Sequence, residues 1–138
     1  MALALQRMVY ESTATGPTGS RLNVAVILAE SQRNNHRDGL TGALAVHRDR
    51  YIQVVEGTAP ALDGLLRRLE TDPRHCDIVL LDRIPITERM FDGWSMASVR
   101  ISTELAPMLD ALMIDAKPSP SWIVMAMRDA LGASVPAE

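Results

Sequence analysis

Two neutral side chains that can share a hydrogen bond stand inside apolar, strand-like runs of this sequence. Gln53 lies in YIQVVEG, residues 51–57, and Tyr10 lies near the end of LALQRMVYE, residues 3–11. A buried amide without hydrogen-bond partners costs about 1–3 kcal/mol of stability, so Gln53 needs a partner if its strand is buried. Taken singly, each residue has a simpler interpretation: Gln53 as an exposed edge residue and Tyr10 as a core tyrosine.

Two further pairs of residues extend this set of neutral polar and polarisable groups. Asn34 and Asn35 are adjacent at the predicted end of a helix, where one asparagine could act as a cap and the second stays unexplained. Trp94 and Met96 are two residues apart in a predicted strand, which places them on the same face. Core packing is the default role for both.

Together these groups describe a neutral hydrogen-bonding pocket, and we predict no catalytic residues. The chain shows no nucleophile with an adjacent base, no carboxylate pair and no phosphate-binding loop motif. Its three histidines are scattered, so we predict no metal ligands. The segment DPRHC, residues 72–76, is either a plain turn or a place where Arg74 and His75 meet a phosphate or a ring edge. Neutral amides suit a planar, uncharged heterocycle, and a flavin ring is one such ligand.

The composition indicates one globular domain. The chain has 138 residues, with 47% hydrophobic and 22% charged residues. A net charge of −3 argues against non-specific binding to nucleic acid. Cys76 is the single cysteine, so no intramolecular disulfide can form. The sequence shows neither an apolar run of membrane-spanning length nor a signal peptide, so we predict a cytoplasmic protein without a membrane association.

The apolar spacing of the first half predicts a strand, a helix and a hairpin. A Gly-, Pro- and Thr-rich stretch separates the first strand from the helix, and HRDR forms the turn of the hairpin. Residues 34–39 are predicted to lead the chain from the helix back into a strand. The predicted elements are a strand over 3–11, a helix over about 20–33, a strand through LTGALAV, and a strand through RYIQVVE that Gly57 ends.

The second half predicts another helix and two more strands. The helix starts near Pro60 and repeats leucine at 62, 65, 66 and 69. Residues 77–84 form a continuous apolar run typical of a buried strand, and WSMASVRIS alternates as a fifth strand. The order βαββαββ predicts an α+β, ferredoxin-like sheet with both helices on one face. The first and third strands are then central neighbours, which brings Tyr10 and Gln53 within reach of each other.

The last residues are predicted to be helical. One helix is expected over 103–115, and KPSPS separates it from a second helix that Gly132 ends. In the second helix Ile123 and Met127 share a side. These helices could cover the sheet face that the first two helices leave open, or that face could pair with a second chain. We therefore divide the chain into a sheet-containing domain over 1–102 and a helical extension over 103–138.

The ordered motifs of the chain resemble the BLUF family of blue-light sensors that use flavin. The similarity covers residues 5 to about 101. It consists of LQRMVYES, NN followed by GLTGAL, YIQVVEG, DPRH and FDGWSM, in that order. Each piece alone is weak, and their combination is highly specific.

The resemblance implies a role for each residue that matches a family position. Tyr10 corresponds to the tyrosine that gives an electron and a proton to the excited flavin. Gln53 corresponds to the glutamine between that tyrosine and the N5/O4 edge of the ring. Asn35 matches the asparagine on the carbonyl side of the ring, and Asn34 a neighbouring contact. Flavin-lining positions correspond to Arg68, Asp72 and His75, and the switching pair of the fifth strand corresponds to Trp94 and Met96.

The resemblance also implies a cofactor and an output. FAD is the usual cofactor of the family, and FMN or riboflavin are alternatives. A change in the orientation or tautomer of Gln53 would reverse the donor and acceptor ends of its amide. That change would pass through the fifth strand to the C-terminal helices and a partner protein, in a homodimer or higher homo-oligomer. Two other functions stay open: an acylphosphatase-like enzyme that uses the NN segment and Arg74, and a dimerisation module without flavin.

Overall fold

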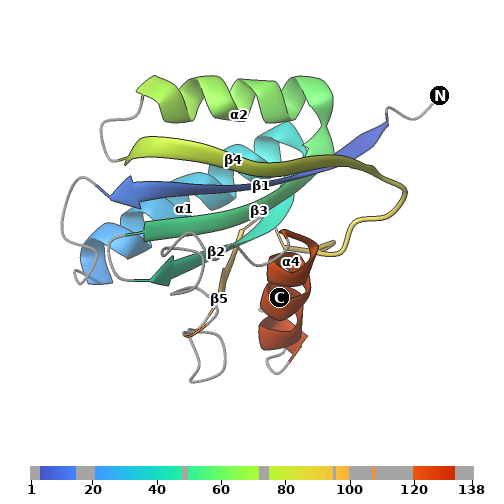
Figure 1. Ribbon diagram of the computed structural model, residues 1–138. Helices are drawn as coiled ribbons and strands as arrows, with labels where there is room; N and C mark the ends of the chain where they lie inside the picture. Colours follow the sequence, from blue (N-terminus) through green and yellow to red (C-terminus); the bar gives the residue numbers. More distant parts are fainter. Residues whose placement is uncertain are drawn as a thin grey trace.

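The computed structural model describes residues 4–14, 21–47, 50–71, 75–94, 96–99, 107 and 120–132. In the described residues, strands and helices follow in the order expected from the sequence, and the predicted helix that ends at Gly132 comes after the last strand (Figure 1). Their bounds are β1 Leu5–Ala14, α1 Arg21–Asp38, β2 Thr41–His47, β3 Arg50–Thr58, α2 Ala59–Thr71, β4 His75–Ile86, β5 Ala97–Val99 and α4 Pro120–Gly132. None of the described helices is long and apolar enough to cross a membrane. The predicted helix over 103–115 lies outside the described residues, apart from residue 107.

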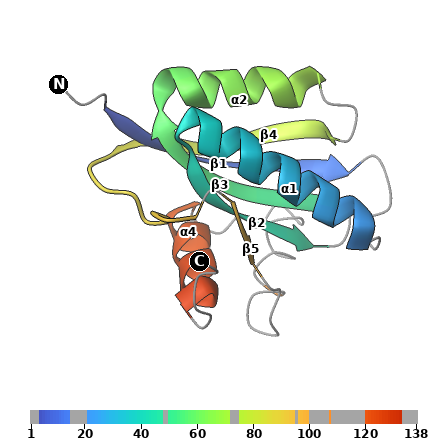
Figure 2. The ribbon, with the colours of Figure 1, turned by 180° about the vertical axis from the view of Figure 1, so that it is seen from behind.

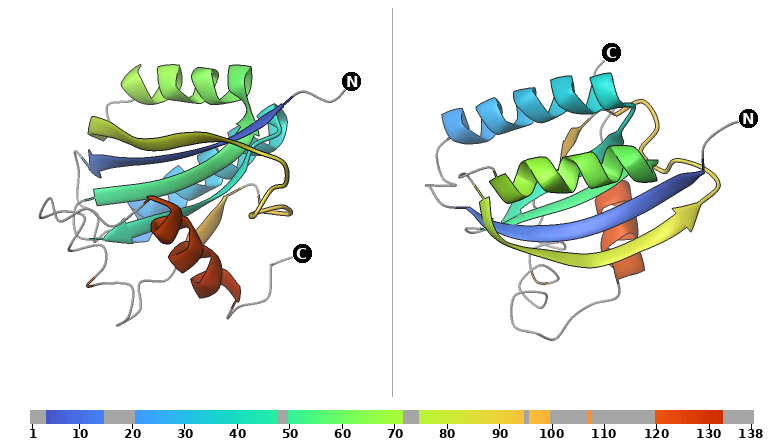
Figure 3. Two further views of the ribbon diagram at one scale, coloured as in Figure 1. Left: turned by 45° about the vertical axis from the view of Figure 1, so that its right-hand side comes forward. Right: turned by 90° about the horizontal axis from the view of Figure 1, so that it is seen from above.

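One five-stranded sheet organises the molecule, with strand order β4-β1-β3-β2-β5. The pairs β1/β3, β1/β4 and β2/β3 are antiparallel, and β5 runs parallel to β2. Helices α1 and α2 cover one face of the sheet, and α4 lies against the opposite face (Figures 2 and 3). The ferredoxin-like βαββαββ arrangement is therefore confirmed, with β1 and β3 as central neighbours.

Strand alternation divides the core into one cluster on each face of the sheet. The cluster under α2 contains Tyr10, Leu44 and Leu62, and the cluster under α4 contains Val9 and Ile52. On the α4 side, the helix contributes three buried residues, Ile123, Val124 and Met127. Burying a side chain of this size stabilises the fold by about 1.5–3 kcal/mol. Helix α4 thus packs on the sheet of its own chain, one of the two arrangements that the sequence left open.

Helix α1 is longer than the sequence predicted. Residues 34–38 are helical, and the left-handed position that ends the helix belongs to Gly39, with φ of 71°. The Gly39 N–H donates to the His36 carbonyl at 3.4 Å, and the Leu40 N–H donates to the Asn35 carbonyl at 2.8 Å. This pair of bonds is a Schellman motif, for which glycine lacks the steric penalty of other residues. The prediction that residues 34–39 connect the helix to the next strand, and a capping role for an asparagine in the left-handed position, were therefore wrong.

Strand β4 lies at the edge of the sheet, so the prediction of a buried strand over 77–84 was also wrong. Val79, Leu80 and Ile84 are 40%, 48% and 36% exposed. A continuous apolar run indicates a strand but does not distinguish a central strand from an edge strand. The topology decides this point, because β4 has β1 as its single neighbour in the sheet.

Candidate functional site

A buried hydrogen bond joins Tyr10 of β1 to Gln53 of β3. The two residues are directly opposite each other in the antiparallel β1/β3 register, so their side chains share a face of the sheet. This is the face covered by α1 and α2, because Tyr10 packs in one cluster with Leu62 of α2. The Tyr10 hydroxyl donates to Gln53 Oε1. Tyr10 is fully buried and Gln53 is 3% exposed. The predicted contact between these two residues is confirmed, and the NH₂ end of the amide keeps its donors for another acceptor.

Burial keeps Tyr10 a neutral phenol. Removal from water disfavours the phenolate and raises the pKa of Tyr10 far above its ordinary value of about 10. The positive charge of Arg68 acts in the opposite direction, and burial outweighs it. Tyr10 therefore holds a proton that it can donate along the bond to Gln53.

This raised pKa predicts a pH dependence of stability. Tyr10 keeps its proton in the folded state at pH values where the unfolded chain has released it. The group therefore contributes no pH dependence below pH about 10, and stability falls as the pH rises above that value. Denaturant unfolding between pH 8 and 11 measures the fall, which should be smaller in Tyr10→Phe. A tyrosinate absorption signal that titrates near pH 10 and is missing in Tyr10→Phe would contradict the raised pKa.

An ion pair connects the two helices on this face. Arg68 of α2 lies with Nη1 at 3.1 Å from Oδ2 of Asp38, the last residue of α1. The other terminal nitrogen, Nη2 of Arg68, is buried and donates no hydrogen bond to the part of the chain that the structure describes. A buried N–H without an acceptor is costly, so this nitrogen marks a position where an acceptor of a ligand would fit. No pattern in the sequence indicates Asp38, because its partner comes 30 positions later from another helix.

The inner side of α1 brings the asparagines to the same face. Asn35 is 1% exposed and Asn34 is half-buried. From the preceding turn of the helix, Gln32 Nε2 donates to the carbonyl oxygen of Met96 at 3.1 Å. Helix α1 thus contacts the segment just before β5 directly.

Met96 and Trp94 lie on opposite faces of the sheet, so the prediction that they share a face was wrong. Met96 is 3% exposed and belongs to the cluster that contains Tyr10, whereas Trp94 packs against the cluster under α4. The reason is local: the Trp94 N–H donates to the Phe91 carbonyl at 3.0 Å, so the chain turns there and strand alternation does not apply. The described part of the fifth strand begins at Ala97.

The side chains of three residues that the sequence singled out, Asp72, Arg74 and His75, are not described. Asp72 and Arg74 lie outside the described residues. His75 begins β4, and its side chain is not among those described. In the described part of the chain, no group of three His, Cys, Asp or Glu residues could hold a metal ion.

Comparison with known proteins identifies the family to which the chain belongs. The model of the BLUF family, described as sensors of blue light using FAD, matches residues 5–97. The chain belongs to the BLUF family. This family consists of photosensors, and its cofactor is a flavin. The acylphosphatase-like alternative is therefore not supported.

Relatives of this BLUF chain include both large and small proteins. The photoactivated adenylate cyclase subunit beta of Euglena gracilis is 33% identical over 95 residues, which are 68% of this chain and 11% of that protein. The chain thus spans about a tenth of that curated relative. The dark-state structure of the BLUF protein BlrB is 29% identical, with a TM-score of 0.75, and the match covers 98% of this chain and all of that one. Klebsiella pneumoniae BlrP1, solved with FMN and cyclic diGMP, is 25% identical with a TM-score of 0.66, over 81% of this chain and 35% of that one.

The residues on the α1 and α2 face fit the flavin of the BLUF family. The buried phenol–amide pair, the buried Asn35 and the free donor on Arg68 Nη2 supply neutral and cationic hydrogen-bonding groups. Such groups suit a ring whose edge carries carbonyl oxygens and nitrogens.

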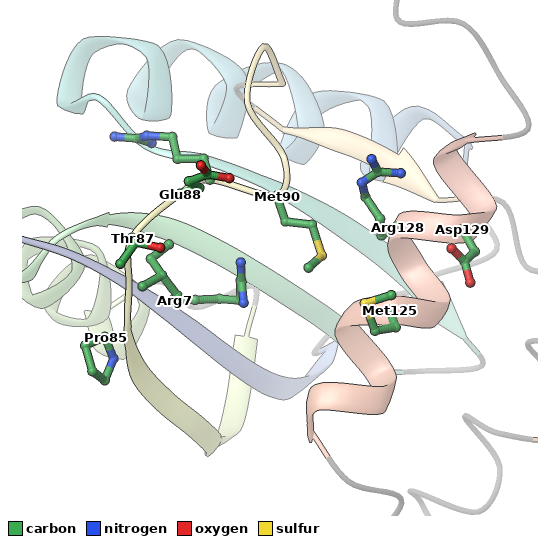
Figure 4. Close-up of a pocket in the computed structure, with 10 residues that line it drawn as sticks. Arg7, Pro85, Thr87, Glu88, Met90, Met125, Arg128 and Asp129 are labelled. Carbon is green, nitrogen blue, oxygen red and sulfur yellow. The ribbon is translucent and has the colours of Figure 1, made fainter.

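A separate cavity of about 740 Å³ lies on the opposite face of the sheet. It opens between α4 and the link that follows β4, with side chains from both (Figure 4). Arg7, Met90, Met125 and Arg128 are among its lining residues. Tyr10 and Gln53 do not line it, so this cavity is distinct from the candidate flavin site.

Proposed function

We propose that Tyr10 and Gln53 are the photoactive pair of this blue-light receptor. The observation that carries the proposal is the buried hydrogen bond from the Tyr10 hydroxyl to Gln53 Oε1 across the two central strands. A bond of this kind gives a proton a direct path from a phenol to an amide. In this structure the oxygen end of the amide faces the tyrosine.

The proposed mechanism uses the two ends of the Gln53 amide. A bound flavin would supply the blue-light absorption and the electron acceptor. Tyr10 would give up an electron to it and pass its hydroxyl proton to Gln53 Oε1, while Gln53 Nε2 would release a proton to a ring nitrogen of the flavin. When an electron and a proton return from the flavin, Tyr10 regains its hydroxyl and Gln53 is left rotated or in its other tautomer. No atom is gained or lost overall, and the difference is the hydrogen-bond pattern that Gln53 offers to its neighbours.

Three polar residues on the two helices are proposed to hold the cofactor. Asn34 and Asn35 belong to α1 and Arg68 to α2, the two helices that cover the face of the Tyr10–Gln53 pair. Asp38 pairs with Arg68 and would position it. Asp72 and His75 stay predictions from the resemblance.

The output is proposed to run from Met96 to Trp94 and α4, and from there to a separate effector protein. Support comes from the placement of these two residues on opposite faces of the sheet, since Met96 packs in the cluster of Tyr10 and Trp94 packs against the cluster under α4. The Euglena relatives are named as photoactivated adenylate cyclase subunits, which links light to an effector in those proteins. Self-association, the division at residue 102 and a cytoplasmic location stay predictions of the sequence.

Purified protein tests the proposal in one absorption experiment. We expect a yellow protein whose flavin band shifts to the red in blue light and returns in the dark. Extraction and chromatography of the pigment distinguish FAD from FMN and riboflavin. A colourless protein that dimerises would instead support the module without flavin, and a yellow protein without any shift would contradict the proposed role of the pair.

A further inference from the structure

A buried carboxylate on the α4 face holds the link between β4 and β5, of which residues 87–94 follow β4 directly. Glu56 of β3 is 0% exposed and accepts hydrogen bonds at both oxygens. Arg7 Nε lies at 3.0 Å and the Met90 N–H at 2.8 Å from Oε2, and Thr41 Oγ1 lies at 3.2 Å and the Phe91 N–H at 2.9 Å from Oε1. Arg7 and Thr41 are the direct register partners of Glu56 on β1 and β2. One carboxylate therefore ties the three central strands to the backbone of the link.

The link held in this way is the segment that reaches both faces of the sheet. Phe91 is 1% exposed and belongs to the same cluster as Ile123 and Met127 of α4. Trp94 packs against that cluster, and its carbonyl accepts from the Gly42 N–H of β2 at 3.0 Å. Two residues later, Met96 lies in the cluster of Tyr10. A displacement of the link therefore changes the packing under α4.

The same link forms a wall of the 740 Å³ cavity. Residues 87–90 line the cavity on one side, and Met125, Arg128 and Asp129 of α4 line it on the other. Figure 4 shows Met90 reaching from the link into the space in front of α4. Arg89 adds a second attachment of this wall to the sheet, since its Nη1 donates to Thr41 Oγ1 at 3.0 Å and to the Glu56 carbonyl at 3.1 Å.

We propose that Glu56 is the positioning residue that couples β3, and with it Gln53, to α4 by holding the backbone of residues 90 and 91 against the sheet. The inference rests on the proposed function, because it supplies the connection from the Tyr10–Gln53 pair to the output helix. Gln53 and Glu56 are three residues apart on one strand, so their side chains emerge on opposite faces. A displacement of β3 caused at Gln53 on one face therefore also displaces residues 90 and 91, which Glu56 holds on the other face.

The chemistry of the anchor requires a carboxylate. Each oxygen of Glu56 accepts from one backbone N–H of the link, Met90 at one end and Phe91 at the other. A glutamine has the same shape, but its NH₂ end cannot accept. In Glu56→Gln, one of these two N–H groups must therefore face a donor in either orientation of the amide. The amide of Gln53 has one donor end and one acceptor end, so rotation changes its hydrogen bonds. The carboxylate of Glu56 has two acceptor oxygens, so it can hold both N–H groups at once.

Amide hydrogen exchange of the flavin-loaded protein under continuous blue light and in the dark tests the proposal. In the wild type, exchange at Met90, Phe91 and α4 is expected to change by at least about fivefold on illumination, the lower end of ordinary coupling between sites. In Glu56→Gln we expect the full red shift, dark exchange at residues 90 and 91 that is about tenfold faster, and loss of the light-dependent change in α4. Glu88→Gln is the matched control, because it removes an exposed charge from the same link and should behave as the wild type.

The outcomes separate the inference from the function on which it rests. A wild type with a normal red shift but no light-dependent exchange at Met90 and Phe91 overturns the role of Glu56, whether or not the variant folds. A folded Glu56→Gln protein that keeps the light-dependent change in α4 overturns it as well. A wild type that binds flavin and shows no red shift contradicts the proposed function instead.

Discussion

Replacing Tyr10 with phenylalanine is expected to keep the flavin and abolish the blue-light red shift. The substitution removes one oxygen from a fully buried ring and leaves its packing in place. Without the hydroxyl there is no proton to pass to Gln53 Oε1, and phenylalanine is a much poorer electron donor. Gln53 Oε1 loses its donor, which should lower the free energy of unfolding by about 1–3 kcal/mol. Absorption spectra before and after a blue flash, together with denaturant unfolding, measure both effects.

The second tyrosine provides the matched control. Tyr51 is 3% exposed and belongs to the same cluster as Tyr10, so Tyr51→Phe removes a phenol from the same face. We expect this variant to keep the red shift. A normal shift in Tyr10→Phe, or a loss of the shift in Tyr51→Phe alone, would sink the assignment of Tyr10 as the donor.

Replacing Gln53 with leucine is expected to have an equally large effect through the other half of the pair. Leucine fills most of the volume of the amide but has neither a donor nor an acceptor. The buried hydroxyl of Tyr10 then lacks its acceptor, at a cost of about 1–3 kcal/mol in the free energy of unfolding. The flavin should remain bound, because Asn35 and Arg68 are untouched, and the red shift should be absent. Flavin content per chain and light-minus-dark absorption measure the two expectations.

Gln6→Leu is the control for this variant. Gln6 lies on β1, where its Oε1 accepts from Arg83 Nε at 2.7 Å, and its register partner on β3 is Gly57. A red shift that survives in Gln53→Leu would show that another group changes state in the light. That result would contradict the proposed role of the Gln53 amide in the light reaction.

The sequence predicted the site through the order of the strands. Hydrophobic spacing and turn residues identify the strands and helices from β1 to β4, and the βαββαββ order makes β1 and β3 neighbours. This order brings Tyr10 within reach of Gln53, and the structure pairs the two residues directly in the β1/β3 register. Hydrophobic spacing and strand order were therefore sufficient to predict this contact.

The errors arise where tertiary context overrides a local pattern. The apolar run of β4 has the composition of a central strand, and its place at the edge depends on the complete topology. The alternation expected for Trp94 and Met96 fails because a turn at Phe91 is held by Glu56 from another strand. The ion pair between Asp38 and Arg68 joins two helices, and nothing in either helix alone indicates it. Helix α1 ends at Gly39 because glycine takes the left-handed position at no cost.

The most direct test of the central claim is the infrared difference spectrum between light and dark for protein labelled with ¹³C and ¹⁵N in its glutamine side chains. The chain has three glutamines, Gln6, Gln32 and Gln53, and leucine at position 6 simplifies the assignment without disturbing the pair. We predict label-sensitive amide bands that change reversibly with the red shift and are absent in Tyr10→Phe. A normal red shift whose difference spectrum contains no label-sensitive glutamine band would contradict the claim that Gln53 changes state.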